Sequence, residues 1–137
     1  MKNLDHIAYA VHDLDKSIEF YKNHFGFEFE SREKIESQGA EIVFLKLKNT
    51  KIELLAPLNE ESKIHKFLKK NGPGIHHVCY KVDNIRKEMA RLENEGLQLI
   101  DNEPRPGAHN TLICFFHPKS TEGVLTELCE YIGTQGD

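Results

Sequence analysis

The chain repeats a short motif, and this internal repeat limits the folds that it can adopt. Residues 4–14 match residues 75–85, because each copy carries a histidine, an aliphatic residue, a small residue, a tyrosine and, two positions later, a valine. A repeat unit that cannot bury its own hydrophobic face must pack against its neighbouring copy. The sequence therefore predicts two similar halves that share one core.

Both halves are predicted to begin with a strand that leads directly into a helix. Residues suited to N-caps follow each strand, with Asp13 or Asp15 in the first copy and Asp83 or Asn84 in the second. Apolar residues then recur at helical spacing, at Leu14, Ile18, Tyr21 and Phe25 in the first copy and at Ile85, Met89 and Leu92 in the second.

Further strand-like segments complete the same order of elements in each half. They are 27–35, 40–47 and 51–56 in the first half, and 97–100, 111–116 and 125–130 in the second. Each half is therefore predicted to be a βαβββ module, and the chain an α+β protein whose two four-stranded sheets form a cleft. We expect one domain over 1–137, with modules at about 1–58 and about 73–132 joined by a linker helix at about 60–72.

Charge and cysteine content exclude several classes of protein. The formal net charge is −4, whereas binding to nucleic acid or to a membrane surface requires a strong basic field. No apolar run approaches the roughly 20 residues of a membrane-spanning helix, and the first residues do not resemble a secretory signal. The three cysteines lack CxxC spacing and lie in strand-like runs, so we expect reduced core thiols in a cytoplasmic protein.

Four polar residues at matching positions of the repeat form the candidate site. A histidine lies on the first strand of each half, His6 and His77, and a glutamate lies on the last strand, Glu53 and Glu127. Imidazole nitrogen and carboxylate oxygen suit Zn, Ni, Co, Mn or Fe. Two carboxylates also neutralise a divalent ion, which makes burial of the whole cluster tolerable. Because both residue types recur in both copies, the pattern favours a metal site.

Short motifs in a specific order run through almost the whole chain. They are residues 4–8, 49–58, 74–79, 107–109, 116–119 and 123–128. Their order and spacing resemble the vicinal oxygen chelate superfamily, which has the glyoxalase and bleomycin-resistance fold. The resemblance covers residues 3–131, and within the superfamily it is strongest to the methylmalonyl-CoA epimerases.

This resemblance implies a divalent ion, Co, Mn, Ni or Zn, bound by the four residues at the matching positions of the repeat. It implies interconversion of (2R)- and (2S)-methylmalonyl-CoA by α-proton transfer through a metal-stabilised enolate. Glu127 and Glu41 are the implied catalytic carboxylates, and Lys119 is a candidate contact for the acyl-CoA thioester. Members of this superfamily are commonly homodimers, so we expect a homodimer here.

Two other functions remain open for a chain with these motifs. Glyoxalase I, the lactoylglutathione lyase, uses the same four ligand types, although residues 116–119 and the double histidine at 76–77 favour the epimerase. A metal-free ligand-binding or resistance protein of the same fold is disfavoured, because all four candidate ligands are present. The lysines of the segment 62–70 could meet CoA phosphates, but a solvated helix face is the simpler interpretation.

Overall fold

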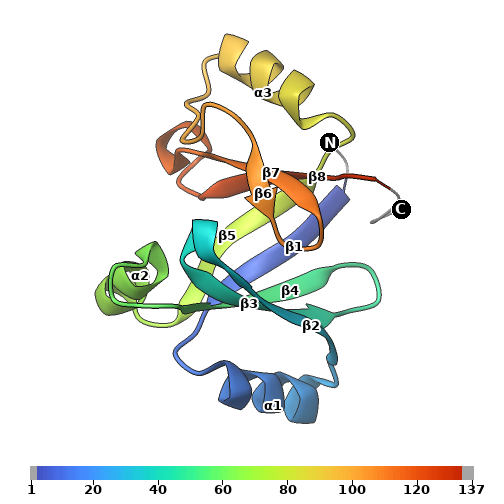
Figure 1. Cartoon of the computed structure of the whole chain (residues 1–137), viewed down its shortest axis with the longest axis vertical. Helices are drawn as coiled ribbons and strands as arrows, with labels where there is room; N and C mark the ends of the chain where they lie inside the picture. Colours follow the sequence, from blue (N-terminus) through green and yellow to red (C-terminus); the bar gives the residue numbers. More distant parts are fainter. Residues whose placement is uncertain (1–2, 134–137) are drawn as a thin grey trace. The chain divides into compact units, whose positions relative to one another are not determined.

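A computed structural model describes residues 3–133 and contains three α-helices and eight strands within them (Figure 1). In chain order the elements are β1 Asn3–Ala10, α1 Leu14–Phe25, β2 Glu28–Ile35, β3 Ala40–Lys46, β4 Lys51–Pro57, α2 Lys63–Asn71, β5 Gly74–Lys81, α3 Ile85–Asn94, β6 Arg105–Gly107, β7 Thr111–Phe116 and β8 Thr126–Tyr131. Short 3₁₀ turns lie at Glu36–Gln38 and Pro118–Ser120.

The chain divides into two compact units. The first unit is His6–His76, and the second contains residues 3–5 together with the described residues from 77 onward. In the first unit the strand order is β2-β3-β4-β1, and in the second it is β5-β8-β7-β6. The β1–β4 and β5–β8 pairs are parallel, and the β2–β3, β3–β4, β6–β7 and β7–β8 pairs are antiparallel. Both units therefore have the predicted βαβββ order, which confirms the expected α+β fold class.

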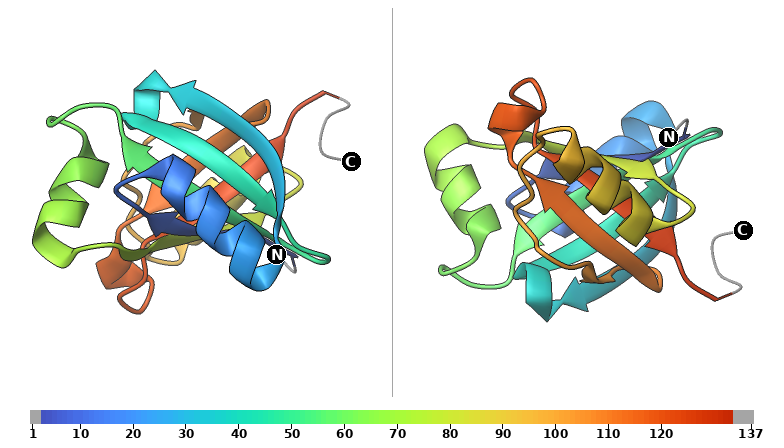
Figure 2. Two further views of the ribbon diagram at one scale, coloured as in Figure 1. Left: turned by 90° about the horizontal axis from the view of Figure 1, so that it is seen from below. Right: turned by 90° about the horizontal axis from the view of Figure 1, so that it is seen from above.

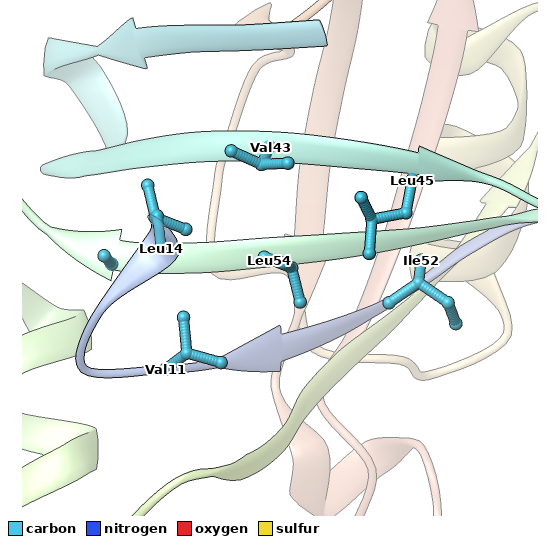
Figure 3. Close-up of a cluster of buried hydrophobic side chains, with 7 residues drawn as sticks. Val11, Leu14, Val43, Leu45, Ile52 and Leu54 are labelled. Atoms are coloured by element: carbon cyan, nitrogen blue, oxygen red, sulfur yellow. The ribbon is translucent and has the colours of Figure 1, made fainter. Parts of the chain in front are cut away.

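Helix α1 covers one face of the sheet in the first unit (Figure 2, left). The helix begins after Asp13, whose side chain accepts the backbone N–H of Lys16, and it ends at Gly26 in the left-handed conformation. These are the physical roles of an N-cap acid and a C-terminal glycine. The core beneath the helix consists of apolar side chains from the strands and the helix (Figure 3): Val11, Leu14, Val43, Leu45, Ile52, Leu54 and Ala56.

Helix α3 occupies the equivalent place in the second unit (Figure 2, right). Its N-cap is Asn84, whose side chain accepts a hydrogen bond from the backbone N–H of Lys87. Under the helix lies a core of Val82, Ile85, Met89, Cys114, Phe116 and Leu128. A separate buried cluster, Cys79, Ile113, Phe115 and Cys129, contains the side chains that alternate with these along the strands. Each sheet therefore buries one face against its helix and keeps a second apolar face, on which the candidate site residues lie.

One predicted strand of the second half is wrong. Residues 97–100 were expected to form a strand, but Leu99 makes only an isolated bridge to Phe116, and the outer strand β6 lies later in the chain. The cause is Asp101, whose carboxylate accepts the backbone N–H of Phe115 at 2.8 Å. A side chain that occupies a backbone donor competes with strand pairing at that position.

The three cysteines are buried and form no disulfide, as the prediction of core thiols requires. Burial raises the pKa of Cys79 well above its ordinary value and the pKa of Cys114 to about 12. A thiol whose pKa is raised by apolar burial is a poor nucleophile. Among residues 3–133, no helix has the length and apolar character needed to cross a membrane.

Candidate metal centre

In the first unit, His6 and Glu53 form a buried pair. They lie on the parallel neighbours β1 and β4, where Ala8 stands opposite Glu53. Because strand side chains alternate, His6 and Glu53 project from the same face of this sheet. The distance from His6 Nε2 to Glu53 Oε1 is 3.4 Å, and each side chain is 5% exposed.

The second unit contains the same pair in the same register. Cys79 stands opposite Glu127 on β5 and β8, just as Ala8 stands opposite Glu53. The distance from His77 Nε2 to Glu127 Oε1 is 2.9 Å, and the two side chains are 1% and 4% exposed. The repeat in the sequence therefore becomes a repeated arrangement of one imidazole and one carboxylate.

The geometry of each pair fits two ligands of one divalent ion. Ligand bonds of about 2.1 Å place two donor atoms about 3.0 Å apart at an octahedral angle and about 3.4 Å apart at a tetrahedral angle. The observed separations of 2.9 and 3.4 Å agree with these values. A carboxylate buried to this degree is costly unless a cation compensates its charge. The donor set of each unit is therefore compatible with a divalent metal.

An aromatic ring packs against each histidine of the candidate site. Phe44 lies edge-on to His6 with ring centroids 5.3 Å apart, and Phe115 lies edge-on to His77 at 5.1 Å. Each phenylalanine stands directly opposite the glutamate of its own unit in the strand register. The rings therefore restrict the orientation of the imidazoles. Phe44 and Phe115 were not predicted as site residues, although they have the same spacing in the sequence as His6 and His77.

A cationic side chain covers each of these phenylalanine rings. Lys51 Nζ lies 5.2 Å from the centroid of Phe44, and the guanidinium carbon of Arg105 lies 5.7 Å from that of Phe115. Arg105 is held by Asp101 at 3.1 Å. Contacts of this kind are electrostatically favourable. Neither cation was predicted from the sequence, because Lys51 and Arg105 lie on non-equivalent strands, so the repeat does not pair them.

The structure does not bring Glu41 to the His6–Glu53 pair. Glu41 stands opposite Ala56, which belongs to the core under α1, whereas Phe44 stands opposite Glu53 on the other face. Its carboxylate accepts a hydrogen bond from Arg32 at 2.9 Å, and Arg32 also contacts Asp15 at 2.6 Å. Glu41 therefore lies away from this pair, and its catalytic role stays a prediction. Its position instead ties β3, through β2, to the start of α1.

Replacing Glu41 by glutamine is expected to leave turnover within about threefold of the wild type and to lower stability slightly. The variant weakens an ion pair that is partly exposed, and such pairs contribute about 0.2–1 kcal/mol. Arg32 donates hydrogen bonds to Asp15 and Glu41, and these raise its pKa, so the remaining Asp15 contact keeps the guanidinium in place. Steady-state kinetics and urea unfolding check this, and a fall in turnover of 100-fold or more would support the catalytic role that the resemblance implies for Glu41.

The structure places the predicted lysines on the surface. Lys119 lies in the 3₁₀ turn between β7 and β8, and its side chain is exposed. Its backbone N–H donates to His117 Nδ1 at 3.1 Å. The four lysines of α2 are exposed too: Lys63, Lys66, Lys69 and Lys70. These lysines fit the solvated helix face that the sequence suggested.

Comparison with known proteins identifies the class to which this fold and these pairs belong. Residues 5–115 match the model of the Glyoxalase/Bleomycin resistance protein/Dioxygenase superfamily. The chain belongs to this superfamily.

Within that superfamily, the chain is similar to methylmalonyl-CoA epimerases. The mitochondrial methylmalonyl-CoA epimerase of Dictyostelium discoideum is 44% identical over 93% of this chain and 77% of the relative. The ethylmalonyl-CoA/methylmalonyl-CoA epimerase of Cereibacter sphaeroides is 42% identical over 91% of this chain and 95% of the relative. A solved methylmalonyl-CoA epimerase in complex with methylmalonyl-CoA and NH4+ has a TM-score of 0.93 at 35% identity, covering 98% of both chains.

Proposed function

We propose that this protein is a metal-dependent epimerase that interconverts (2R)- and (2S)-methylmalonyl-CoA. It is an isomerase that acts on an acyl-CoA by moving the proton at the α carbon. The observation that carries the proposal is the pair of equivalent, buried histidine–glutamate arrangements in a chain 44% identical to an epimerase of this substrate. The relative solved with methylmalonyl-CoA supports the substrate class.

The proposed metal ligands are the two repeated pairs, acting together on one ion. They are His6, Glu53, His77 and Glu127. Two neutral imidazoles and two carboxylates balance the charge of a divalent ion, so the complete set can be buried without a net charge. Co, Mn, Ni and Zn all accept this mixture of nitrogen and oxygen ligands. When bound, such an ion stabilises the negative charge that develops on the thioester oxygen as the α proton leaves.

Glu127 is the proposed proton acceptor. A carboxylate has two oxygens, so one can face the metal while the other accepts a proton. Oε1 of Glu127 lies 2.9 Å from His77 Nε2, and the 4% exposure of the side chain keeps bulk water from competing for the proton. Epimerisation also requires an acid on the other side of the substrate, which gives a proton to the opposite face of the planar carbon while Glu127 keeps the abstracted one.

Lys119 is the proposed contact for the acyl-CoA. Its exposed ammonium group suits the phosphates of CoA, which are anionic. The spacing between the paired residues Phe115 and Glu127 is three residues longer than that between Phe44 and Glu53. The extra length lies in the β7–β8 connection, which contains Lys119. The second half therefore has a longer loop at this place than the first half, which is compatible with a substrate-binding segment specific to one half.

Exposed aromatic residues support a homodimer as a further part of the proposal. Phe20 and Phe25, both on α1, are 47% and 60% exposed, and their ring centroids lie 6.0 Å apart. Large exposed apolar groups that lie together are typical of interaction surfaces. Sedimentation equilibrium that gave the mass of a single chain at all concentrations would contradict this part of the proposal. The cytoplasmic location stays a prediction.

The experiment that tests the function is hydrogen exchange at the α carbon. Metal-reconstituted protein is incubated with methylmalonyl-CoA in deuterated water, and deuterium at the α carbon is followed by mass spectrometry. We expect metal-dependent incorporation, with conversion of the 2R into the 2S thioester. The hemithioacetal of methylglyoxal and glutathione is assayed in parallel. Activity on the hemithioacetal alone would assign the chain to glyoxalase I, and inactivity on both substrates with metal bound would overturn both functions.

A further inference from the structure

A second cluster of potential ligands lies in the second unit, adjacent to the His77–Glu127 pair but sharing no residue with it. It consists of Asp5, Cys79 and Cys129, whose ligand atoms all lie within 4.8 Å of one another. Cys79 is 0% exposed, Cys129 is 2% exposed and Asp5 is 9% exposed. Two thiols and a carboxylate therefore lie together in an apolar interior. Burial of a carboxylate there is costly unless a hydrogen bond or a cation compensates it.

A hydrogen bond from Tyr131 orients the carboxylate of this cluster. The Tyr131 hydroxyl donates to Asp5 Oδ1 at 2.8 Å. Metal-binding carboxylates are commonly held by such an outer hydrogen bond, which fixes their direction. Tyr131 therefore holds the Asp5 carboxylate in one orientation, as such an outer hydrogen bond does at a metal site.

The strand register argues against a disulfide between the two cysteines. Cys79 stands opposite Glu127, whereas Cys129 stands opposite Lys81, so the cysteines are offset by two residues along β5 and β8. With strands about 4.8 Å apart and a rise of about 3.3 Å per residue, that offset separates their Cα atoms by about 8 Å. Disulfides require less than about 7 Å. The two sulfurs of one tetrahedral ion, in contrast, lie about 3.8 Å apart, which is compatible with the observed cluster.

We propose that Asp5, Cys79 and Cys129 form a binding site for a thiophilic divalent ion of the Zn²⁺ class. Coordination replaces the two thiol protons, which pass to solvent, so two thiolates and one carboxylate surround the ion. Sulfur ligands select softer ions than the imidazole and carboxylate ligands of the histidine–glutamate pairs. The two sites therefore differ in metal preference, and this proposal does not depend on the proposed epimerase activity.

Cadmium titration of the Mn²⁺-loaded protein tests the proposal. Cd²⁺ is the probe, because its bonds to thiolates give an ultraviolet charge-transfer absorption that nitrogen and oxygen ligands do not give. We expect this absorption to saturate at one Cd²⁺ per chain. It should be lost in both Cys79→Ser and Cys129→Ser. Asp5→Asn should retain the absorption, but its affinity for Cd²⁺ should be lower by roughly tenfold or more.

Cys114→Ser is the matched control. Cys114 is also a buried strand cysteine, but it lies in the core under α3 and not in the proposed site. This variant should keep the full absorption and stoichiometry. Circular dichroism and thermal melting establish that each variant is folded, and Asp5→Asn tests the site with both thiols intact. Absence of the absorption in the wild type, or wild-type affinity in Cys129→Ser or in Asp5→Asn, would overturn the proposal.

Discussion

Replacing Glu127 by glutamine is expected to lower the rate of α-proton exchange by roughly 10³-fold. A positioned general base contributes about 10²–10⁴-fold to the rate of proton transfer, and an amide has no comparable basicity. The change is nearly isosteric, so the strand pairing of β8 with β5 and β7 should persist. The measurement is deuterium incorporation at the α carbon of methylmalonyl-CoA, under metal saturation.

Glu41→Gln is the matched control for this variant. Both substitutions remove one carboxylate from a strand residue, but Glu41 lies on the face of its sheet that packs against α1. Retained exchange in Glu41→Gln together with its loss in Glu127→Gln would separate the role of Glu127 from a general effect of charge. Equal losses in the two variants would contradict the assignment of the base to Glu127.

Substitution of either histidine of the repeat should abolish tight binding of a single metal ion. After loading with Mn²⁺, which the thiolate ligands of the second proposed site do not favour, His6→Ala and His77→Ala are each expected to reduce bound Mn²⁺ from one ion per chain to nearly none after gel filtration. Loss of a residue that only hydrogen-bonds to a metal ligand lowers the affinity for the metal by roughly 10- to 100-fold. Loss of a direct ligand should lower it further. Elemental analysis of the purified variants measures the stoichiometry directly.

The equal effect of the two histidines is the decisive part of this result. If each histidine–glutamate pair held its own ion, each variant would lose only half of the metal. His12→Ala is the control, because His12 is exposed and lies outside the repeat-matched set. Loss of metal in that variant would point to general destabilisation instead of coordination.

The repeat in the sequence carried much of the fold prediction. The equivalence of residues 4–14 and 75–85 predicted two βαβββ units, and both are present. It also placed a histidine on the first strand and a glutamate on the last strand of each half, and the structure shows that these strands are parallel neighbours. Such prediction succeeds because alternation along a strand and capping at a helix are local properties.

Local pattern alone could not establish which face of β3 carries Glu41. The residues that follow it are apolar and buried on both faces, since each residue from 42 to 45 is at most 4% exposed. Alternation therefore gives no signal, and only the pairing of Glu41 with Ala56 above the α1 core decides its direction. Local pattern was also insufficient at 97–100, where no strand forms. There Asp101 accepts a hydrogen bond from the backbone N–H of Phe115, which is distant in sequence.

Side-chain identity and short-range periodicity thus specify the elements of this protein and the residues that can bind a metal. Tertiary pairing decides which of them meet. It brings Phe115 against His77, Tyr131 onto Asp5 and Arg32 between Asp15 and Glu41. Each of these contacts joins residues on different elements, so its geometry depends on how the strands and helices pack and not on spacing along the chain.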